Sequence, residues 1–259
     1  MPPDDQTQLH RMDPLARFTN RAEEYVKYRP SYPEEALSAI LDGLGEPAQL
    51  VVADVGAGTG ISSRLLAGRG CRVSAIEPNQ AMIDVAEPHP LVEFKQGQAE
   101  DTGLAEDSVH AVTCFQSFHW FEPAGALREF HRILKPGGRL ALVWNDRDLD
   151  DPVSSAYTAI IQEASGNHPA EGARLSSDNL GETPYFPEAR KAVFKNHQDL
   201  DLDGLIGRAR SSSYVPREGP EHDAMVDALG KLYAEMRRPH GAIRMGYLTN
   251  VYLTEAKQG

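Results

Sequence analysis

The stretch Val51–Ile61 constrains the fold of this chain more than any other part of its sequence. Counting from Leu50, five of the six residues before the first glycine are apolar and most are β-branched. Such a run is typical of a parallel strand that is buried on both faces. Gly56, Gly58 and Gly60 then end the strand at alternating positions, and a helix is expected to follow. A ligand can approach the backbone closely at a turn of this kind.

Strands and helices alternate regularly on both sides of this turn. The helix after the glycines is expected to place Ile61, Leu65 and Leu66 on its inner face and to end at Gly68 and Gly70. The other predicted strands are Cys71–Ile76, Leu91–Lys95, Val109–Phe115 and Arg139–Asn145, and the predicted helices between them are Asn79–Glu87 and Pro123–Leu134. This alternation indicates right-handed βαβ units and a parallel sheet with helices on both faces.

The second half of the chain is less regular. Helices are expected over Pro152–Ala164, Gly204–Ser212 and Glu221–Arg237, a loop over Gly166–Pro187, and strands over Ala192–Leu200 and Ile243–Thr254. The last helix is expected to turn inward Met225, Leu229, Leu232 and Met236. The two strands would extend the sheet as an antiparallel edge hairpin, with the helices between them over the pocket mouth. Candidates for lining a substrate chamber are Arg147, Tyr185, Arg210, Tyr247 and Tyr252.

The segment before the glycine turn combines aromatic and cationic side chains. A helix is expected over Pro14–Arg29, followed by an extended bend and a second helix that opens at Pro33. The densest such group in the chain falls here and consists of Tyr25, Tyr28, Arg29 and Tyr32. Two interpretations stay open: a helix pair that packs on the sheet edge, or a lid over the glycine turn. The expected division is an N-terminal helical lid (1–48), a ligand-binding core (49–150) and a C-terminal part (151–259) that completes the sheet and caps the pocket.

Composition limits the classes of partner. A formal net charge of −12 argues against a nucleic-acid surface, which needs a concentrated basic face. No apolar run is long enough to cross a bilayer and no signal peptide is visible, so no membrane contact and a cytoplasmic location are expected. Cys71 and Cys114 are expected to be buried free thiols. The histidines and acids have no metal-ligand spacing, so no metal is expected, and the chain is expected to be a monomer or a homodimer.

Ile61 narrows what the glycine turn can bind. A phosphate-cradling NTPase loop needs a lysine at this position to reach the terminal phosphates, so that class of site is excluded. A dinucleotide site needs its third glycine there, to let the helix pack beneath a pyrophosphate, so that class is disfavoured. The pattern is G-x-G-x-G instead.

Read as Asp54-x-Gly56-x-Gly58-x-Gly60, the turn resembles the first motif of class I S-adenosylmethionine-dependent methyltransferases. Further motifs of that family follow in register: Glu77 at the end of the second strand, Gln98-Ala99-Glu100 after the third, Phe118-His119-Trp120-Phe121 after the fourth, and Leu134-Lys135-Pro136-Gly137-Gly138 before the fifth. The N-terminal Ala22-x-x-Tyr25-x-x-Tyr28-Arg29-Pro30-x-Tyr32-Pro33 is similar to the lid of trans-aconitate-methyltransferase-like enzymes. The resemblance implies a doubly wound, Rossmann-like α/β fold with a mostly parallel seven-stranded sheet, helices on both faces and an antiparallel edge strand.

The resemblance also implies a set of cofactor-binding residues. Glu77 would accept both ribose hydroxyls, and the segment from Gln98 to Glu100 would contact adenine. Many relatives carry Asp at the position of Gln98, so Glu100 is an alternative partner for the adenine amino group. The implied set is Tyr25, Arg29, Asp54, Gly56, Ala57, Gly58, Thr59, Gly60, Glu77, Pro78, Met82, Gln98, Ala99, Glu100, Gln116, Ser117 and Trp120.

The implied reaction transfers a methyl group from S-adenosylmethionine to an O, N or carboxylate of a small molecule. The cofactor supplies the activated methyl, and the protein mainly positions the acceptor and excludes water. His119 is the candidate base for acceptors that must lose a proton, between aromatic neighbours that would wall the pocket, and Tyr28 is the second catalytic candidate. Arg29 could pair with a carboxylate of substrate or cofactor. Two other classes stay open: an NAD-type oxidoreductase, and a cofactor-binding partner protein without catalysis.

Overall fold

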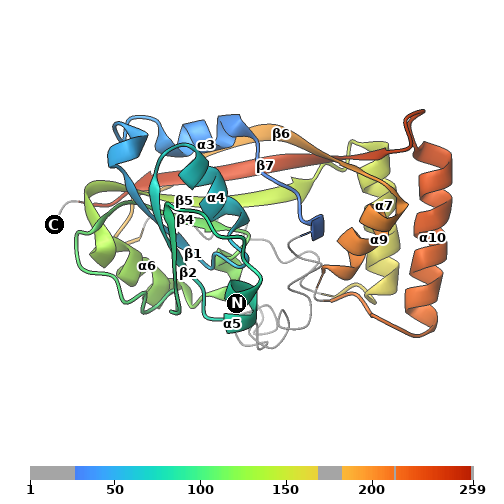
Figure 1. The fold of residues 1–259 in the computed structure, drawn as a ribbon, viewed down its shortest axis with the longest axis horizontal. Helices are drawn as coiled ribbons and strands as arrows, with labels where there is room; N and C mark the ends of the chain where they lie inside the picture. Colours follow the sequence, from blue (N-terminus) through green and yellow to red (C-terminus); the bar gives the residue numbers. More distant parts are fainter. Residues whose placement is uncertain (1–26, 169–182, 213, 258–259) are drawn as a thin grey trace, which may run out of the picture.

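The computed structural model describes residues 27–168, 183–212 and 214–257. Tyr25, most of the predicted helix over Pro14–Arg29, and much of the predicted loop over Gly166–Pro187 lie outside these ranges. The described chain forms one seven-stranded sheet with helices against both faces, and three further helices stand beyond one end of the sheet (Figure 1). The expected α/β fold is therefore confirmed.

The sheet is mostly parallel, and its order is β3-β2-β1-β4-β5-β7-β6. The strands are β1 Val51–Val55, β2 Arg72–Ile76, β3 Val92–Lys95, β4 Val109–Phe115, β5 Leu134–Arg147, β6 Arg190–Leu200 and β7 Ile243–Glu255. The first five pair in parallel, whereas β7 runs antiparallel to both β5 and β6. The chain order reverses between β1 and β4, which makes their carboxyl ends the switch point where ligands bind in such sheets.

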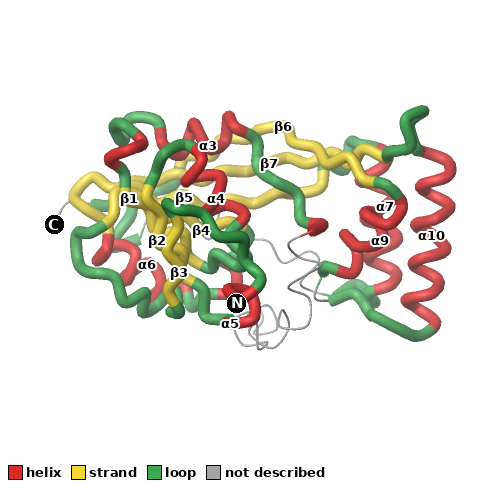
Figure 2. The backbone as a smooth tube through the Cα atoms, in the orientation of Figure 1, coloured by secondary structure: helices red, strands yellow, loops and turns green. Residues whose placement is uncertain are grey.

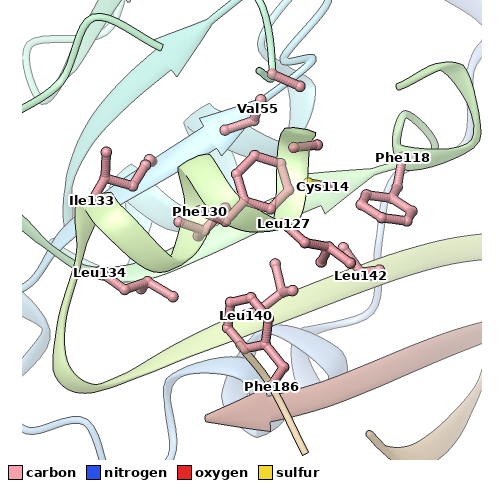
Figure 3. Close-up of a cluster of buried hydrophobic side chains, with 14 of the residues drawn as sticks. Val55, Cys114, Phe118, Leu127, Phe130, Ile133, Leu134, Leu140, Leu142 and Phe186 are labelled. Atoms are coloured by element: carbon pink, nitrogen blue, oxygen red, sulfur yellow. The ribbon is translucent and has the colours of Figure 1, made fainter. Parts of the chain in front are cut away.

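Two hydrophobic clusters cover the two faces of the sheet. The helices of this part are α3 Glu34–Leu41, α4 Ile61–Gly68, α5 Gln80–Asp84 and α6 Pro123–Ile133, with the short helices η3 Pro47–Gln49 and η4 Phe118–Trp120. On one face α3 and α4 pack against the sheet. On the other face α6 does so through Leu127, Phe130 and Ile133 (Figure 3). Successive side chains of a strand point to opposite faces of the sheet. Along β1, Val52 therefore joins the cluster with α3 and α4, whereas Ala53 and Val55 join the cluster with α6.

The C-terminal helices form a third cluster at the far end of the long strands. The helices α7 Pro152–Ala164, α9 Leu202–Arg210 and α10 Pro220–Met236 lie side by side there (Figures 1 and 2). Their apolar side chains meet the first residues of β7. Strands β5, β6 and β7 thus extend past the parallel core and carry a helical group beside the carboxyl end of β5 (Figure 2).

Most predicted elements are confirmed, with local differences. Cys71 and Cys114 are buried free thiols, as expected. On α4, Ile61 and Leu65 are only half-buried, and the inner face contains two serines instead. Met236 at the end of α10 is 39% exposed, so its predicted inward position is wrong. The helix predicted over Asn79–Glu87 is shorter, and the Asn79 side chain caps it by accepting a hydrogen bond from the Ala81 N–H.

Candidate functional site

The turn after β1 adopts a backbone that favours glycine at all three glycine positions. The φ angles are +69° at Gly56, +57° at Gly58 and +75° at Gly60. A Cβ on Gly56 would lie 2.5 Å from the Cβ of Ser117, so this position needs glycine for space as well as for conformation. The turn is therefore in close contact with the segment that follows β4.

Asp54 supports the turn from below. Its Oδ2 accepts hydrogen bonds from the hydroxyls of Ser62 (2.7 Å) and Ser63 (2.6 Å), and its Oδ1 accepts one from Thr113 (3.0 Å). The side chain has no exposed surface, and burial raises the pKa of its carboxyl. Asp54 thereby ties β1 to β4 and to the first turn of α4. A direct contact between Asp54 and a cofactor, as predicted, conflicts with this burial, and we assign it to holding the turn.

Glu77 closes the other side of the turn. Its Oε2 accepts a hydrogen bond from the Gly58 N–H at 2.8 Å, and its Oε1 accepts one from the Asn79 N–H at 2.9 Å. Burial raises the pKa of this carboxyl, although the two backbone hydrogen bonds favour its charged form. Each carboxylate oxygen accepts more than one hydrogen bond, so these contacts leave acceptor capacity for two ribose hydroxyls.

The carboxyl end of β4 forms the opposite wall. Ser117 donates its hydroxyl to the Val55 carbonyl at 2.8 Å, which fixes the wall against β1. Gln116 has a φ of +57°, an uncommon conformation for a residue with a side chain, and its amide donates to the Asn145 carbonyl at 3.1 Å. Backbone strain of this kind concentrates at binding and catalytic sites.

A cavity of about 20 Å³ joins this wall to the N-terminal segment. Arg29 and Tyr32 line it from one side, and Gly56, Ala57 and Gln116 from the other. It has room for about one water molecule, so a nucleoside must displace part of its walls. The structure thus brings the predicted Arg29 to the glycine turn.

The remaining residues of the predicted cofactor set differ in how deeply they are buried. Thr59 is buried, and its hydroxyl oxygen has no hydrogen-bond partner among the described residues. Met82 and Ala99 are each 4% exposed and Pro78 is half-buried. Trp120 is half-buried, with its ring centroid 4.9 Å from that of His119.

The segment after β3 is anchored to α6. Gln98 is exposed and its backbone pairs with Asp101, whereas Glu100 accepts a hydrogen bond from the Glu122 N–H at 2.7 Å. Glu100 is thus held towards the start of α6. Its alternative role at adenine stays a prediction.

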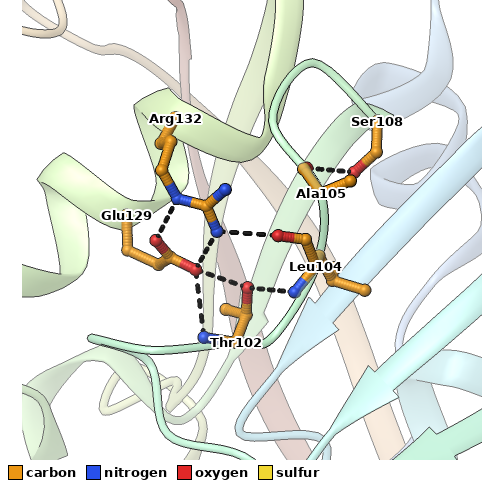
Figure 4. Close-up of polar contacts among 6 residues, drawn as sticks. All are labelled: Thr102, Leu104, Ala105, Ser108, Glu129 and Arg132. Carbon is orange, nitrogen blue, oxygen red and sulfur yellow. Dashed lines mark hydrogen bonds and ion pairs between the residues drawn. The ribbon is translucent and has the colours of Figure 1, made fainter.

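Figure 4 shows the polar network behind this segment. Glu129 of α6 accepts hydrogen bonds from the Thr102 N–H and hydroxyl at 3.0 and 2.6 Å. Arg132 donates twice to the same carboxylate, at 2.7 Å each, and once to the Leu104 carbonyl. The network fixes the loop that carries the predicted adenine contacts.

His119 is held by an indole. The Trp144 Nε1–H donates to its Nδ1 at 3.2 Å, and Trp144 is itself packed against Tyr252. A neutral imidazole that accepts at Nδ1 carries its proton on Nε2. In this arrangement Nε2 is a hydrogen-bond donor, so His119 is less suited to its predicted role of general base. Phe118, predicted to wall the pocket beside His119, is 1% exposed and belongs to the core instead.

The second catalytic candidate, Tyr28, faces the C-terminal helices. A Cβ on Gly207 of α9 would overlap its ring, so the ring packs directly on the helix backbone. The Tyr28 carbonyl accepts a hydrogen bond from Gln198 at 3.0 Å. These contacts give Tyr28 a packing role, and its catalytic role stays a prediction.

The residues proposed to line a substrate chamber separate into different places. Arg147 and Tyr247 meet at the end of β5, near two residues that the sequence analysis did not single out, Tyr157 and Arg208. Tyr252 packs on Trp144 in the core. Tyr185 packs against His131 of α6, and Arg210 donates to His222 of α10. The burial of Arg208 could have been predicted from the sequence, because its helical spacing places it on the same buried face of α9 as Leu205 and Ala209.

The described residues contain no helix long and apolar enough to cross a membrane. Within those same ranges, no group of three or more His, Cys, Asp or Glu side chains could hold a metal ion.

Comparisons with known proteins identify methyltransferases, the class of enzyme whose first motif the glycine turn resembles. A family model described as a methyltransferase domain matches residues 53–142, from β1 into β5. An uncharacterised methyltransferase of Mycobacterium tuberculosis is 42% identical over 139 residues, which are 53% of this chain and 56% of the relative. The chain thus matches only about half the length of this relative.

Two further comparisons extend over almost the whole chain. An uncharacterised methyltransferase of Schizosaccharomyces pombe is 32% identical over 247 residues, covering 92% of this chain and 96% of the relative. The structure of a proposed type II methyltransferase from Anaeromyxobacter dehalogenans shares 26% identity with a TM-score of 0.70, over 87% of this chain and 97% of that one. The chain, with its glycine turn at the switch point of a Rossmann-like sheet, therefore belongs to the methyltransferase family.

Proposed function

We propose that this protein transfers the methyl group of S-adenosylmethionine to a small molecule. The observation that carries the proposal is the cradle at the switch point: three glycines with positive φ, held between the Glu77 carboxylate and the Ser117 wall. The cradle is closed to larger residues, because a Cβ on Gly56 or Gly60 would meet a side chain within 3 Å. The buried hydroxyl of Thr59 adds a polar group for a ligand at this turn. The residues present fit the cofactor of this family.

Each part of the cofactor has residues suited to it. Glu77 would hold the ribose hydroxyls, since a carboxylate accepts from both and would repel a 2′-phosphate. Residues 98–100 would lie along the adenine, and the backbone of Gly56–Gly60 with the wall at Gln116 would hold the amino-acid part. When bound, the cofactor supplies an electrophilic methyl group on a sulfonium.

The chain's own residues then have a positioning task. His119 donates from Nε2 to the acceptor molecule and orients it, while the indole of Trp144 keeps the ring in this tautomer. Residues 1–48 and 151–259 act as lid and cap, which enclose the acceptor and exclude water.

A binding comparison tests the proposal against the NAD alternative. Calorimetric titration of the full chain with S-adenosylhomocysteine and, separately, with NAD is expected to give heat only with the first ligand. Ile61 supports this outcome, since it begins α4 where a dinucleotide site needs glycine. Heat with NAD and none with S-adenosylhomocysteine at millimolar concentration would overturn the proposal. Transfer of labelled methyl to a metabolite mixture then separates an enzyme from a cofactor-binding partner protein.

A further inference from the structure

Three arginines from separate parts of the chain converge beside the C-terminal helices. Arg29 precedes α3, Arg147 ends β5 and Arg208 lies in the last turn of α9. All three exert their charge on the ring of Tyr214, and two of them act on Tyr157 of α7. We call the three arginines with these two tyrosines the arginine cluster.

Arg208 is buried, and the acids of the described residues include no ion-pair partner for it. The residue is 5% exposed, and its guanidinium donates hydrogen bonds to the hydroxyl groups of Ser211 and Ser212, both at 3.4 Å. Its Nε–H is buried and has no hydrogen-bond partner, and no acid among the described residues forms an ion pair with it. An isolated buried cation is costly, so proteins pair buried charges with an anion.

A second buried polar group in the cluster lacks a partner. The Tyr157 hydroxyl has no exposed surface and no hydrogen-bond partner among the described residues. Burial raises the pKa of Tyr157 to about 12, so the hydroxyl stays protonated and can donate. The Arg147 guanidinium lies over the same ring, 5.3 Å from its centroid. The charges of Arg208 and Arg147 therefore both act on this buried hydroxyl, which is itself a donor.

The electrostatics of Tyr214 agree with an excess of positive charge. Burial by itself raises the pKa of this phenol, but the charges of Arg147, Arg29 and Arg208 and a hydrogen bond with Ser212 lower it more, and the net shift is downward. A phenol whose anionic form is favoured in this way reports a positive potential.

The arginine cluster adjoins the glycine turn. Arg29 lines the cavity at Gly56, and its Nη2 donates to the Ser211 carbonyl at 3.2 Å, at the end of α9. Arg147 follows two residues after Asn145, which lines the same cavity. The cluster is thus placed next to the proposed cofactor site and on the side of the C-terminal cap.

We propose that the arginine cluster, centred on Arg208, binds an anionic group of the methyl acceptor, either a carboxylate or a phosphate. This inference rests on the proposed function, because it gives the substrate class of that same site. A guanidinium forms paired hydrogen bonds with both groups, and the Tyr157 hydroxyl donates a further one. The acceptor is then an acid or a phosphate ester whose charge orients it towards the cofactor.

The test uses the full chain saturated with S-adenosylhomocysteine. Its thermal midpoint is followed as sodium malonate, sodium phosphate or uncharged malonamide is added, with sodium chloride keeping the ionic strength constant. Malonate or phosphate is expected to raise the midpoint, malonamide is not, and the anion that acts at the lower concentration identifies the group. No shift with either anion, while S-adenosylhomocysteine still binds, overturns the inference and leaves the proposed function standing.

Two variants in the arginine cluster and one control variant test whether the stabilising anion binds there. In Arg208→Gln the anion concentration for half-maximal stabilisation is expected to rise at least about tenfold, as loss of one charge-assisted contact gives. Tyr157→Phe, which removes only the buried hydroxyl, is expected to weaken the anion response without loss of folding. Arg244→Gln removes an exposed cation that pairs with Asp199 and is expected to change nothing. An anion response that is the same in wild type, Arg208→Gln and Tyr157→Phe would overturn the inference.

Discussion

The glycine turn and the arginine cluster are built in opposite ways. The turn is local: residues 54 to 60 supply its backbone, and Glu77 and Ser117 brace it with hydrogen bonds to neighbouring main-chain groups. The arginine cluster is assembled from side chains of an N-terminal segment, the end of β5, helices α7 and α9, and the segment that follows α9. Both hold buried polar groups without a hydrogen-bond partner among the described residues: the Thr59 hydroxyl in the turn, and the Arg208 Nε–H and Tyr157 hydroxyl in the cluster. We therefore expect a division of labour, in which the backbone cradle binds the cofactor and the side chains of the cluster select the acceptor.

The largest effect is expected from a substitution that adds a methyl group to the glycine turn. Gly56→Ala is expected to destabilise the protein by about 3 kcal/mol, because a positive φ and the overlap with Ser117 both oppose it. Binding of S-adenosylhomocysteine should be lost with it, as calorimetry would show. Gly43→Ala is the matched control, since Gly43 also has a positive φ (+77°) but no atom within 4 Å of an added Cβ. Equal effects of the two substitutions would contradict the role given to the close approach at Gly56.

The network behind residues 98–100 gives a pH-dependent prediction. Burial alone raises the pKa of the Glu129 carboxyl, but hydrogen bonds from Arg132 and Thr102 lower it more, and the net pKa is below its usual 4.5. Its contribution to stability is therefore full above pH 4.5 and is lost as the pH falls through the folded-state pKa. Glu129→Gln is expected to cost about 2 kcal/mol at pH 7 in urea unfolding and less as the pH falls below 4.5. A difference that does not change with pH would contradict this account.

The arginine cluster predicts a substitution that separates stability from binding. Arg208→Met keeps most of the side-chain volume and removes a buried cation that pairs with no acid in the described part of the chain. Without added anions, the free energy of unfolding is expected to stay the same or to rise by about 1 kcal/mol. The response to malonate or phosphate should disappear. A loss of more than about 2 kcal/mol would show instead that the Arg208 charge supports the fold.

The smallest effect is expected outside both regions. The Asp199–Arg244 ion pair joins β6 to β7, and both side chains are 37% exposed. Asp199→Asn is expected to cost less than about 1 kcal/mol, because solvent screens exposed pairs. Neither S-adenosylhomocysteine nor anion binding should change. A larger loss of stability would contradict the small contribution expected of this exposed ion pair.

Local features were predictable from sequence, and features made by distant segments were not. The β1 strand and the glycine turn follow from residue order alone, and so do β4 and α7, whose bounds are as predicted. The inner face of α4 was misjudged because Ser62 and Ser63 are buried to serve Asp54, which a hydrophobic pattern does not indicate.

The candidate chamber was predicted less well than the turn. Arg147 and Tyr247 do lie together, at the arginine cluster, but Tyr185 packs on α6, because the route of its segment depends on tertiary contacts. Arg208 was missed, although an arginine at the buried spacing of a helix is a signal that can be sought. Tyr157 lies on the apolar face of α7 and its sequence position is typical of a core residue; only the structure shows that its hydroxyl has no hydrogen-bond partner among the described residues.

The central claim, that the glycine turn and Glu77 hold S-adenosylmethionine, is tested most directly by calorimetric titration with S-adenosylhomocysteine. Wild type is compared with Glu77→Ala and with Glu93→Ala, an exposed acid on β3. Glu77→Ala is expected to weaken binding about 100-fold, the effect of losing two hydrogen bonds to a charged group, while Glu93→Ala binds like wild type. Equal affinity of a folded Glu77→Ala protein and wild type would contradict the account.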